Sequence, residues 1–232
     1  MIGLDRLPML FEIWGVPKQL LLNATLQNKQ CFNNLTDVAI KYCDSLKYVF
    51  PSVAAQNLCQ LDNLQIVGCH RLTRITGEAP EGMPANVQNG HVLFANLRAV
   101  HIGSCRNLRN LFSVTTARSL GKLEELKVND MPNLVELISN EESERREEND
   151  KIIVLPELKV LRITNSGNME RLCTEAFCMD LPSLEEFVLL ECPKMADTVK
   201  RGLGSASNLL KAQIEEQSFF GTMAREVFSR KV

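Results

Sequence analysis

One pattern of apolar positions recurs along the chain. Counted from an anchor leucine at offset 0, apolar residues also occupy offsets +3, +5, +8 and +11 in six successive units. The anchors are Leu35, Leu61, Leu97, Leu123, Leu158 and Leu184. Of thirty such positions, only Ser166 is clearly not apolar, whereas chance at 45% hydrophobic residues would fill about half of them. The chain is therefore built from internal repeats.

The spacing of the anchors alternates between a short and a long unit. Successive anchors are separated by 26, 36, 26, 35 and 26 residues. Upstream, Leu4, Leu7 and Leu10 fit offsets +5, +8 and +11 of an earlier unit whose anchor would lie just before Met1. We therefore count one partial and six full units, and we expect the chain to be the C-terminal piece of a longer protein.

Each unit predicts one coil of a leucine-rich-repeat solenoid. Offsets +3 and +5 alternate with exposed positions, which is the period of a β-strand. One coil cannot bury its own apolar face, whereas stacked coils share a continuous core. We predict an α/β fold, a right-handed solenoid with a concave parallel sheet and with short helices and loops on the convex side. The predicted strands span residues 37–41, 63–67, 99–103, 125–129, 160–164 and 186–190.

The predicted solenoid covers residues 1–204, and residues 205–232 are predicted to form a C-terminal capping strand and helix. The strand prediction rests on Leu209, Ala212 and Ile214. The helix prediction rests on apolar residues spaced by three, four and seven between 219 and 228. At the other end, we expect the edge formed by residues 4–14 to be partly exposed. Short helices are predicted on the convex side within 51–59, 113–121 and 174–181.

Composition restricts the function more than the fold. The 26 basic and 28 acidic side chains give a net charge of -2, so no overall field attracts nucleic acid or an anionic membrane. The N-terminus lacks a basic signal-peptide region, and no stretch approaches eighteen uncharged apolar residues. The acidic segment 141–150 contributes -4; it is either a solvated loop or a contact for a basic partner.

No catalytic, metal or cofactor site is predicted. None of the three histidines, His70, His91 and His101, accompanies a recognisable serine or cysteine nucleophile motif. Four cysteines share offset +8, namely Cys43, Cys69, Cys105 and Cys192. They should stack at about 4.8 Å per coil as a buried column, without the tetrahedral convergence that zinc requires. Because burial raises a thiol pKa, we expect them to be reduced and slow to alkylate.

The outward positions of the predicted strands carry the candidate binding residues. Offset +1 alternates in sign along the coils, through Asp62, Arg98, Glu124, Lys159 and Glu185. Neighbouring strands place these side chains about 5 Å apart, close enough to pair. Offset +4 contains a short basic strip, His101, Lys127 and Arg162. Two interpretations stay open: a charge ladder that sets the coil register, or a surface for an acidic partner. The predicted protein-binding residues are His101, Lys127, Arg162, Arg98, Glu124, Lys159 and Glu185.

Several phrases of the chain resemble a known family. The likeness rests on two long segments, FANLRAVHIGSCRNLRNLF and SVTTARSLGKLEELKVNDMPNLVELI. It also rests on the acidic loop after ELI and on the LPxLxxIW motif formed by Leu7, Pro8, Leu10, Ile13 and Trp14. They are similar to the C-terminal leucine-rich repeats of plant coiled-coil nucleotide-binding (NB-ARC) disease-resistance proteins. The resemblance covers roughly residues 1–200.

The resemblance implies the sensing and autoinhibitory part of an intracellular plant immune receptor. Its partners would be the nucleotide-binding domain of the parent protein and a pathogen effector or host target, with no nucleic acid and no membrane span. ATP or ADP would bind in that other domain, since this chain has no G-x-x-x-x-G-K-[ST] motif. The expected location is the cytoplasm, with the nucleus or the plasma-membrane periphery reached through other domains. The alternative is the substrate-recognition arm of an F-box-type ubiquitin ligase.

Overall fold

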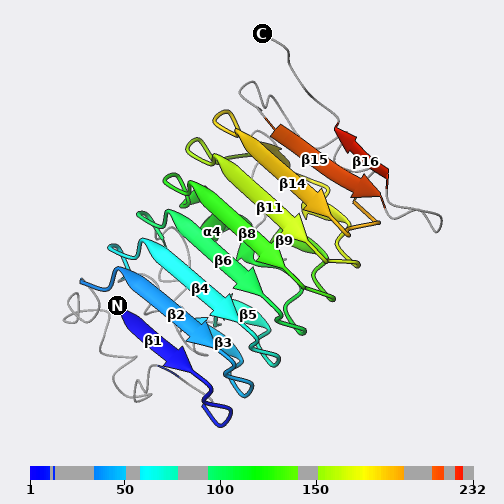
Figure 1. The fold of residues 1–232 in the computed structure, drawn as a ribbon. Coiled ribbons are helices and arrows are strands. Elements are labelled where there is room, and N and C mark those ends of the chain that lie inside the picture. Colours follow the sequence, from blue (N-terminus) through cyan, green and yellow to red (C-terminus); the bar gives the residue numbers. More distant parts are fainter. Residues whose placement is uncertain are drawn as a thin grey trace.

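In the computed structural model, successive coils share one large sheet of nine strands (Figure 1). The structure describes residues 1–10, 13, 34–50, 58–77, 94–140 and 151–195, and the backbone of residues 211–216 and 223–226. In spatial order, the strands are β1 (Ile2–Asp5), β2 (Asp37–Lys41), β4 (Asn63–Val67), β6 (Ala99–Gly103), β8 (Glu125–Asn129), β11 (Val160–Thr164), β14 (Glu186–Leu190), β15 (Lys211–Glu216) and β16 (Met223–Glu226). Every neighbouring pair is parallel except β15 and β16.

The six predicted strands are confirmed with their predicted bounds, as β2, β4, β6, β8, β11 and β14. Their register keeps equal offsets opposite one another, so that Leu64 lies opposite both Val38 and Val100. The partial upstream unit obeys the same rule, because Leu4 of β1 lies opposite Ile40 of β2. The repeat found in the sequence is therefore also the repeat of the sheet.

The repeated apolar positions form one continuous core. All six anchor leucines are buried, and the apolar residues at offsets +3, +5, +8 and +11 of the six full units are buried with them. Ser166, the polar exception, is 0% exposed, and its hydroxyl donates to the Thr164 carbonyl oxygen at 3.2 Å. The Cys105 thiol at the same offset donates to the Gly103 carbonyl oxygen at 3.3 Å. Serine and cysteine can both occupy this offset, because either side chain donates to the backbone carbonyl oxygen two residues earlier.

Each coil turns at offset +7 through a residue with left-handed backbone conformation. The φ angles lie between 49° and 68° at Arg6, Tyr42, Gly68, Ser104, Asp130, Asn165 and Glu191. Six of these seven are not glycine, which is uncommon for this conformation. Side chains stabilise the turns, since the Asp130 carboxylate accepts from the Ser104 hydroxyl at 2.8 Å and from the Asn165 amide at 3.1 Å. The turn directs offset +8 into the core.

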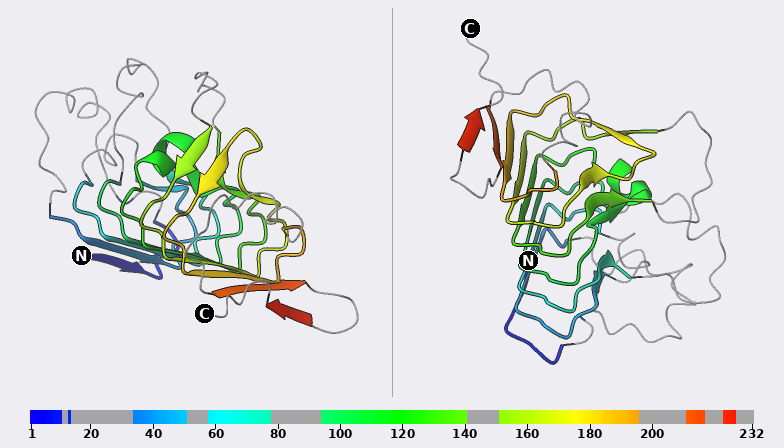
Figure 2. Two further views of the ribbon diagram at one scale, coloured as in Figure 1. Left: turned by 90° about the horizontal axis from the view of Figure 1, so that it is seen from above. Right: turned by 90° about the vertical axis from the view of Figure 1, so that its right-hand side faces the viewer.

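The coils return on the side opposite the large sheet (Figure 2). Small parallel sheets there pair β3 (Tyr48–Phe50) with β5 (Arg74–Thr76), β9 (Glu136–Ser139) with both β7 (Phe112–Ser113) and β12 (Arg171–Cys173), and β10 (Ile152–Val154) with β13 (Cys178–Asp180). Within 113–121, α4 (Val114–Arg118) confirms a predicted helix, and the Ser113 hydroxyl caps it by accepting the Thr116 N–H at 3.2 Å. Residues 174–181 contain a turn and β13 instead of a helix. Residues 51–57 lie outside the described part of the chain.

The C-terminal end corrects one prediction. The last parallel strand is confirmed, because β15 places Ala212 opposite Phe187 of β14. Residues 223–226, for which apolar spacing predicted a helix, instead form β16, which pairs antiparallel with β15. A strand suits this place because the outer edge of β15 would otherwise leave its backbone groups unpaired.

The N-terminal edge is partly exposed, as predicted. Leu10 is half-buried against the core, and Leu7 and Met9 are exposed. Trp14, for which we also expected incomplete cover, lies outside the described residues.

Candidate protein-recognition surface

The seven predicted binding residues, which we call the sheet face, lie in or directly before the strands of the large sheet. Offset +4 supplies His101, Lys127 and Arg162 from within strands, and offset +1 supplies Arg98, Glu124, Lys159 and Glu185, each one residue before a strand. Arg98, Lys159, Arg162 and Glu185 are exposed, whereas His101, Glu124 and Lys127 are half-buried. Offsets +3 and +5 point into the core, so offsets +2 and +4 of the same strands face outward. The sheet face is therefore a row of polar side chains on a rigid backbone.

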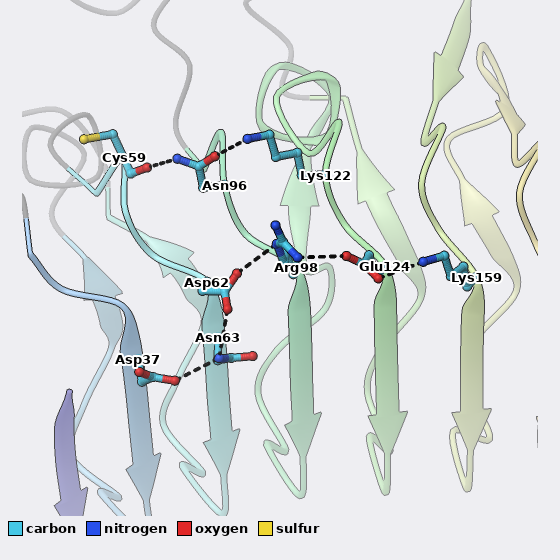
Figure 3. Close-up of polar contacts among 9 residues, drawn as sticks. All are labelled: Asp37, Cys59, Asp62, Asn63, Asn96, Arg98, Lys122, Glu124 and Lys159. Atoms are coloured by element: carbon cyan, nitrogen blue, oxygen red, sulfur yellow. Dashed lines mark hydrogen bonds and ion pairs between the residues drawn. The ribbon is translucent and has the colours of Figure 1, made fainter.

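The charge ladder at offset +1 is formed from Asp62 to Lys159 (Figure 3), whereas no ion pair joins Lys159 to Glu185 among the described residues. The Arg98 guanidinium lies between Asp62, with Nε 3.3 Å from Oδ1, and Glu124, with Nη1 3.4 Å from Oε1. The next step joins Lys159 Nζ to Glu124 Oε2 at 2.9 Å. This hydrogen bond lowers the pKa of the Glu124 carboxyl and raises the pKa of Lys159. Exposed pairs of this kind contribute little to stability.

The basic strip at offset +4 is not a row of free cations. His101 Nε2 lies 2.7 Å from Glu125 Oε1, and Lys127 Nζ pairs with the same oxygen. Farther along, Arg162 Nη2 lies 2.8 Å from Glu186 Oε1. Each nitrogen-bearing side chain of the strip thus has a carboxylate beside it, and the surface carries acidic as well as basic groups.

The environment of Glu125 keeps its carboxylate ionised. Burial raises the pKa of Glu125, but hydrogen bonds from Lys127 and His101 outweigh it, so the net pKa is lowered. At neutral pH the cluster therefore consists of one carboxylate held between two nitrogen-bearing side chains. A partner that docks here must either displace Glu125 or bind the whole cluster.

Sequence reasoning missed Glu125 and Glu186, although a signal was available. Both occupy offset +2, which faces the same side of the sheet as offset +4. The offset +2 positions are Asp37, Asn63, Ala99, Glu125, Val160 and Glu186. Comparing offset +4 of one coil with offset +2 of the next brings together two of the three pairs. The same offset also supplies the hydrogen bond from the Asn63 amide to Asp37 Oδ1 at 2.8 Å (Figure 3).

The predicted thiol column is confirmed as buried, and its cysteines are free thiols. Burial raises the pKa of Cys43, and it raises the pKa of Cys192 to about 11. A hydrogen bond with Cys69, together with burial, raises the pKa of Cys105. Contrary to our expectation, the four thiols do not all behave alike. A hydrogen bond from the Cys105 thiol stabilises the thiolate of Cys69 and so lowers the pKa of Cys69. Within the described residues, no group of three or more His, Cys, Asp or Glu side chains is placed to hold a metal ion.

The comparisons with known proteins agree with the leucine-rich repeat. The family model described as "Plant disease resistance protein RPS2-like, leucine-rich repeats" matches residues 2–70 and 85–132, just over half of the chain. The chain belongs to this family. Searches of curated proteins and of solved structures find no significant match.

Family membership makes the chain a leucine-rich-repeat region of the plant disease resistance type. Repeats of this architecture are generally non-catalytic surfaces for protein–protein interaction. The matched residues include Arg98, His101, Glu124 and Lys127 of the sheet face, whereas Lys159, Arg162 and Glu185 lie beyond them. No helix in the described ranges is long and apolar enough to cross a membrane.

Proposed function

We propose that this chain is the recognition and autoinhibitory module of an intracellular plant immune receptor acting in defence against pathogens. The repeats hold the nucleotide-binding domain of the parent protein inactive, and they release it when a pathogen effector or an altered host protein docks. ATP or ADP binds in that domain and not in this chain. Family membership supports a defence-related recognition role. The inhibitory contact between the repeats and the nucleotide-binding domain is our own proposal beyond that role.

The observation that carries the proposal is the mixed-charge sheet face. Its side chains lie within β6, β8 and β11 or one residue before a strand of the large sheet, so a partner orders little backbone when it binds. Charges at such a surface mainly set the association rate and the choice of partner. Because the pairs are partly exposed, a docking surface of matching charge pattern can exchange an internal ion pair for an intermolecular one.

The test is a charge reversal in the full-length parent protein. Replacing His101, Lys127 and Arg162 with Glu should abolish binding of the nucleotide-binding domain or of the effector, or cause signalling without a pathogen. The reversal also sets the new glutamates against Glu125 and Glu186. A second variant therefore adds Glu125→Lys and Glu186→Lys, which restores pairing within the face while keeping the new carboxylates at offset +4.

The two variants separate docking from folding. Loss of binding in both, with an unchanged thermal melt for the second, supports direct recognition by the sheet face. Recovery of normal behaviour in the second variant means that the residues serve only the coil register. Unchanged binding and unchanged inhibition in both variants mean that the partner docks elsewhere.

The ubiquitin-ligase alternative is decided by the sequence encoded upstream in the same gene. A nucleotide-binding P-loop there supports the receptor, and an F-box supports the substrate-recognition arm of a ligase. The same observation tests the proposed cytoplasmic location and its extension to the nucleus or to the plasma-membrane periphery, since those addresses would be carried by other domains.

A further inference from the structure

A second charged region lies on the turns that follow the strands of the large sheet. We call offsets +9 to +13 the turn edge, and we number the six full coils from their anchors. Coils 1 to 3 place Lys47, Arg71, Arg74, Arg106 and Arg109 on this edge, against a single acid, Asp44. The net charge of this part is +4, in a chain whose net charge is -2. The sheet-face proposal does not use any of these residues.

Four of these cations, Lys47, Arg71, Arg106 and Arg109, form what we call the basic turn patch. All four are exposed. In contrast to the cations of the sheet face, none of them makes an ion pair within the part of the chain that the structure describes. Asp44 is already engaged, because its Oδ1 accepts the His70 N–H at 3.3 Å.

On the same edge of coils 4 to 6, cations pair with acids of the protein itself. The Arg171 guanidinium pairs with three carboxylates: Nη1 lies 2.6 Å from Glu175 Oε1, Nη2 lies 3.2 Å from Glu170 Oε2, and Nε lies 3.9 Å from Glu136 Oε2. Lys194 of coil 6 lies 3.9 Å from Glu170. The turn geometry therefore allows cations to be neutralised by the protein itself, whereas the turn edge of coils 1 to 3 contains only one acid, Asp44.

Backbone contacts hold the basic turn patch in place. The Lys47 carbonyl oxygen accepts the Thr73 N–H at 2.9 Å, and the Arg109 carbonyl oxygen accepts the Val135 N–H at 2.9 Å. The Asn133 amide donates to the Arg106 carbonyl oxygen at 2.8 Å. With coils about 4.8 Å apart, the four cations span only about 10 Å along the stack. The patch is thus compact, and its backbone is already ordered before a partner arrives.

We propose that the basic turn patch is a second docking surface, which binds an acidic segment of a partner polypeptide. Three of its four cations are arginines, whose planar guanidinium groups bind carboxylates through two parallel hydrogen bonds. A nucleic acid fits less well, because affinity for a phosphate backbone grows with the number of neutralised phosphates and the chain as a whole is slightly acidic. The patch spans three coils, which suits a short carboxylate-rich stretch.

The experiment compares two variants that remove the same charge from different surfaces. The edge variant carries Lys47→Gln, Arg71→Gln, Arg106→Gln and Arg109→Gln. The face variant carries Arg98→Gln, Lys127→Gln, Lys159→Gln and Arg162→Gln. The probe is a fluorescent peptide of alternating Glu and Ser, titrated into the whole chain at low and at physiological salt, with a Gln and Ser peptide and a short DNA duplex as competing ligands.

We expect the edge variant to lose about tenfold or more in affinity for the acidic peptide. The affinity of the face variant should stay within about twofold of that of the unmodified chain. The neutral peptide should not bind, and salt should weaken the complex. Equal losses in both variants would show that only net charge matters, and an unaffected edge variant would also overturn the proposal. Tighter binding of the DNA duplex, lost in the edge variant, would replace the polypeptide by a nucleic acid.

Folding is controlled separately. A variant with Lys47→Arg, Arg71→Lys, Arg106→Lys and Arg109→Lys keeps the four charges and should keep binding. If the edge variant does not melt cooperatively, single Arg71→Gln and Arg106→Gln variants replace it, and both should weaken binding. The edge variant and its charge-keeping control leave the sheet face intact, so a failure of these two variants to behave as expected would not bear on the inhibitory role proposed above.

Discussion

The sheet face and the turn edge are built by the same coils, but they treat their cations differently. On the sheet face, Arg162 and Lys127 lie beside Glu186 and Glu125. On the turn edge of coils 1 to 3, Arg71 and Arg106 have no such partner in the described ranges. The net charge of the whole chain does not reveal this difference, whereas the charges sorted by offset and by neighbouring coil do.

The difference follows from how each region repeats. Parallel pairing places equal offsets side by side, so a surface is balanced only when neighbouring coils alternate in sign or when two outward offsets carry opposite signs. The sheet face satisfies both conditions, through the ladder centred on Arg98 and through Glu125 between His101 and Lys127. The turn edge of coils 1 to 3 carries five cations against one acid, and we propose that this excess charge serves a partner.

Both regions depend on one core, so the largest expected effect comes from a change beneath the sheet face. Leu126 is buried between the outward residues Glu125 and Lys127 of β8. Leu126→Ala should destabilise the chain by about 2–5 kcal/mol, because it removes buried methyl groups and leaves a cavity. Lys127→Ala, one residue away, should cost no more than about 1 kcal/mol. Urea unfolding of the two variants measures the contrast, and equal losses would contradict the inward and outward assignment of β8.

The next effect concerns the turns that carry the turn edge. Gly68 has φ 68°, and a Cβ added there would lie 2.5 Å from Tyr42 Cδ1. Gly68→Ala should therefore cost about 1–3 kcal/mol, from left-handed strain and from displacement of the Tyr42 ring. The double variant with Tyr42→Ala should recover the part that is due to the clash. Chemical denaturation of the single and double variants measures this, and no recovery would mean that backbone strain alone sets the cost.

A smaller effect compares the two regions directly. Arg162→Gln removes the partner of Glu186 on the sheet face and should destabilise the chain by about 0.2–1 kcal/mol. Arg106→Gln should leave stability unchanged or raise it slightly, because it relieves repulsion among exposed cations. Thermal melts at low and at high salt measure both, and added salt should reduce the difference. A larger loss at Arg106 than at Arg162 would mean that the turn edge is neutralised after all.

The sequence was sufficient for the fold because the repeat determines both the strand positions and their register. Offsets +3 and +5 alone predict β2, β4, β6, β8, β11 and β14, since a parallel solenoid has no freedom to pair unequal offsets. The small strands on the opposite side, where short helices and loops were expected, were not predicted. Residues 223–226 were predicted wrongly, since a short apolar spacing does not distinguish a helix from a strand that covers a free edge. The absence of a helix in 174–181 has the same origin, because chain length permits a helix there without requiring one.

The candidate site was predicted only in part. The partners of Arg98 followed from one offset repeated along the stack. To predict the partners of His101 and Arg162, one must compare offset +4 of one strand with offset +2 of the next. Such pairs depend on how far the side chains extend between strands, which the spacing of the repeat does not give. The turn at offset +7 left a trace in the types of residue, since Gly68, Asp130 and Asn165 belong to the types that tolerate left-handed backbone.

The smallest expected effect is a pH dependence that has opposite signs in the two regions. On the sheet face, the hydrogen bonds from Lys127 and His101 hold the pKa of Glu125 below its ordinary value despite burial. Its contribution to stability is therefore present above the ordinary glutamate pKa and is lost as the pH falls through the lowered value. On the turn edge, burial raises the pKa of Glu136 although Arg171 lies nearby. Its contribution is present below the ordinary pKa and is lost as the pH rises through the raised value.

Glutamine variants isolate these two contributions. Between about pH 3 and pH 7, the stability difference between the parent chain and Glu125→Gln should grow with rising pH, whereas the difference between the parent chain and Glu136→Gln should shrink or change sign. Melting temperatures measured across this range for the three proteins give both slopes. Over this pH range each stability difference should change by only a few tenths of a kcal/mol. The changes are small because Glu125 is partly exposed and because the Arg171 guanidinium offsets part of the cost of burying the Glu136 carboxylate. Slopes of the same sign would mean that Glu125 is governed by burial, as Glu136 is, and that the cluster around it does not hold its charge.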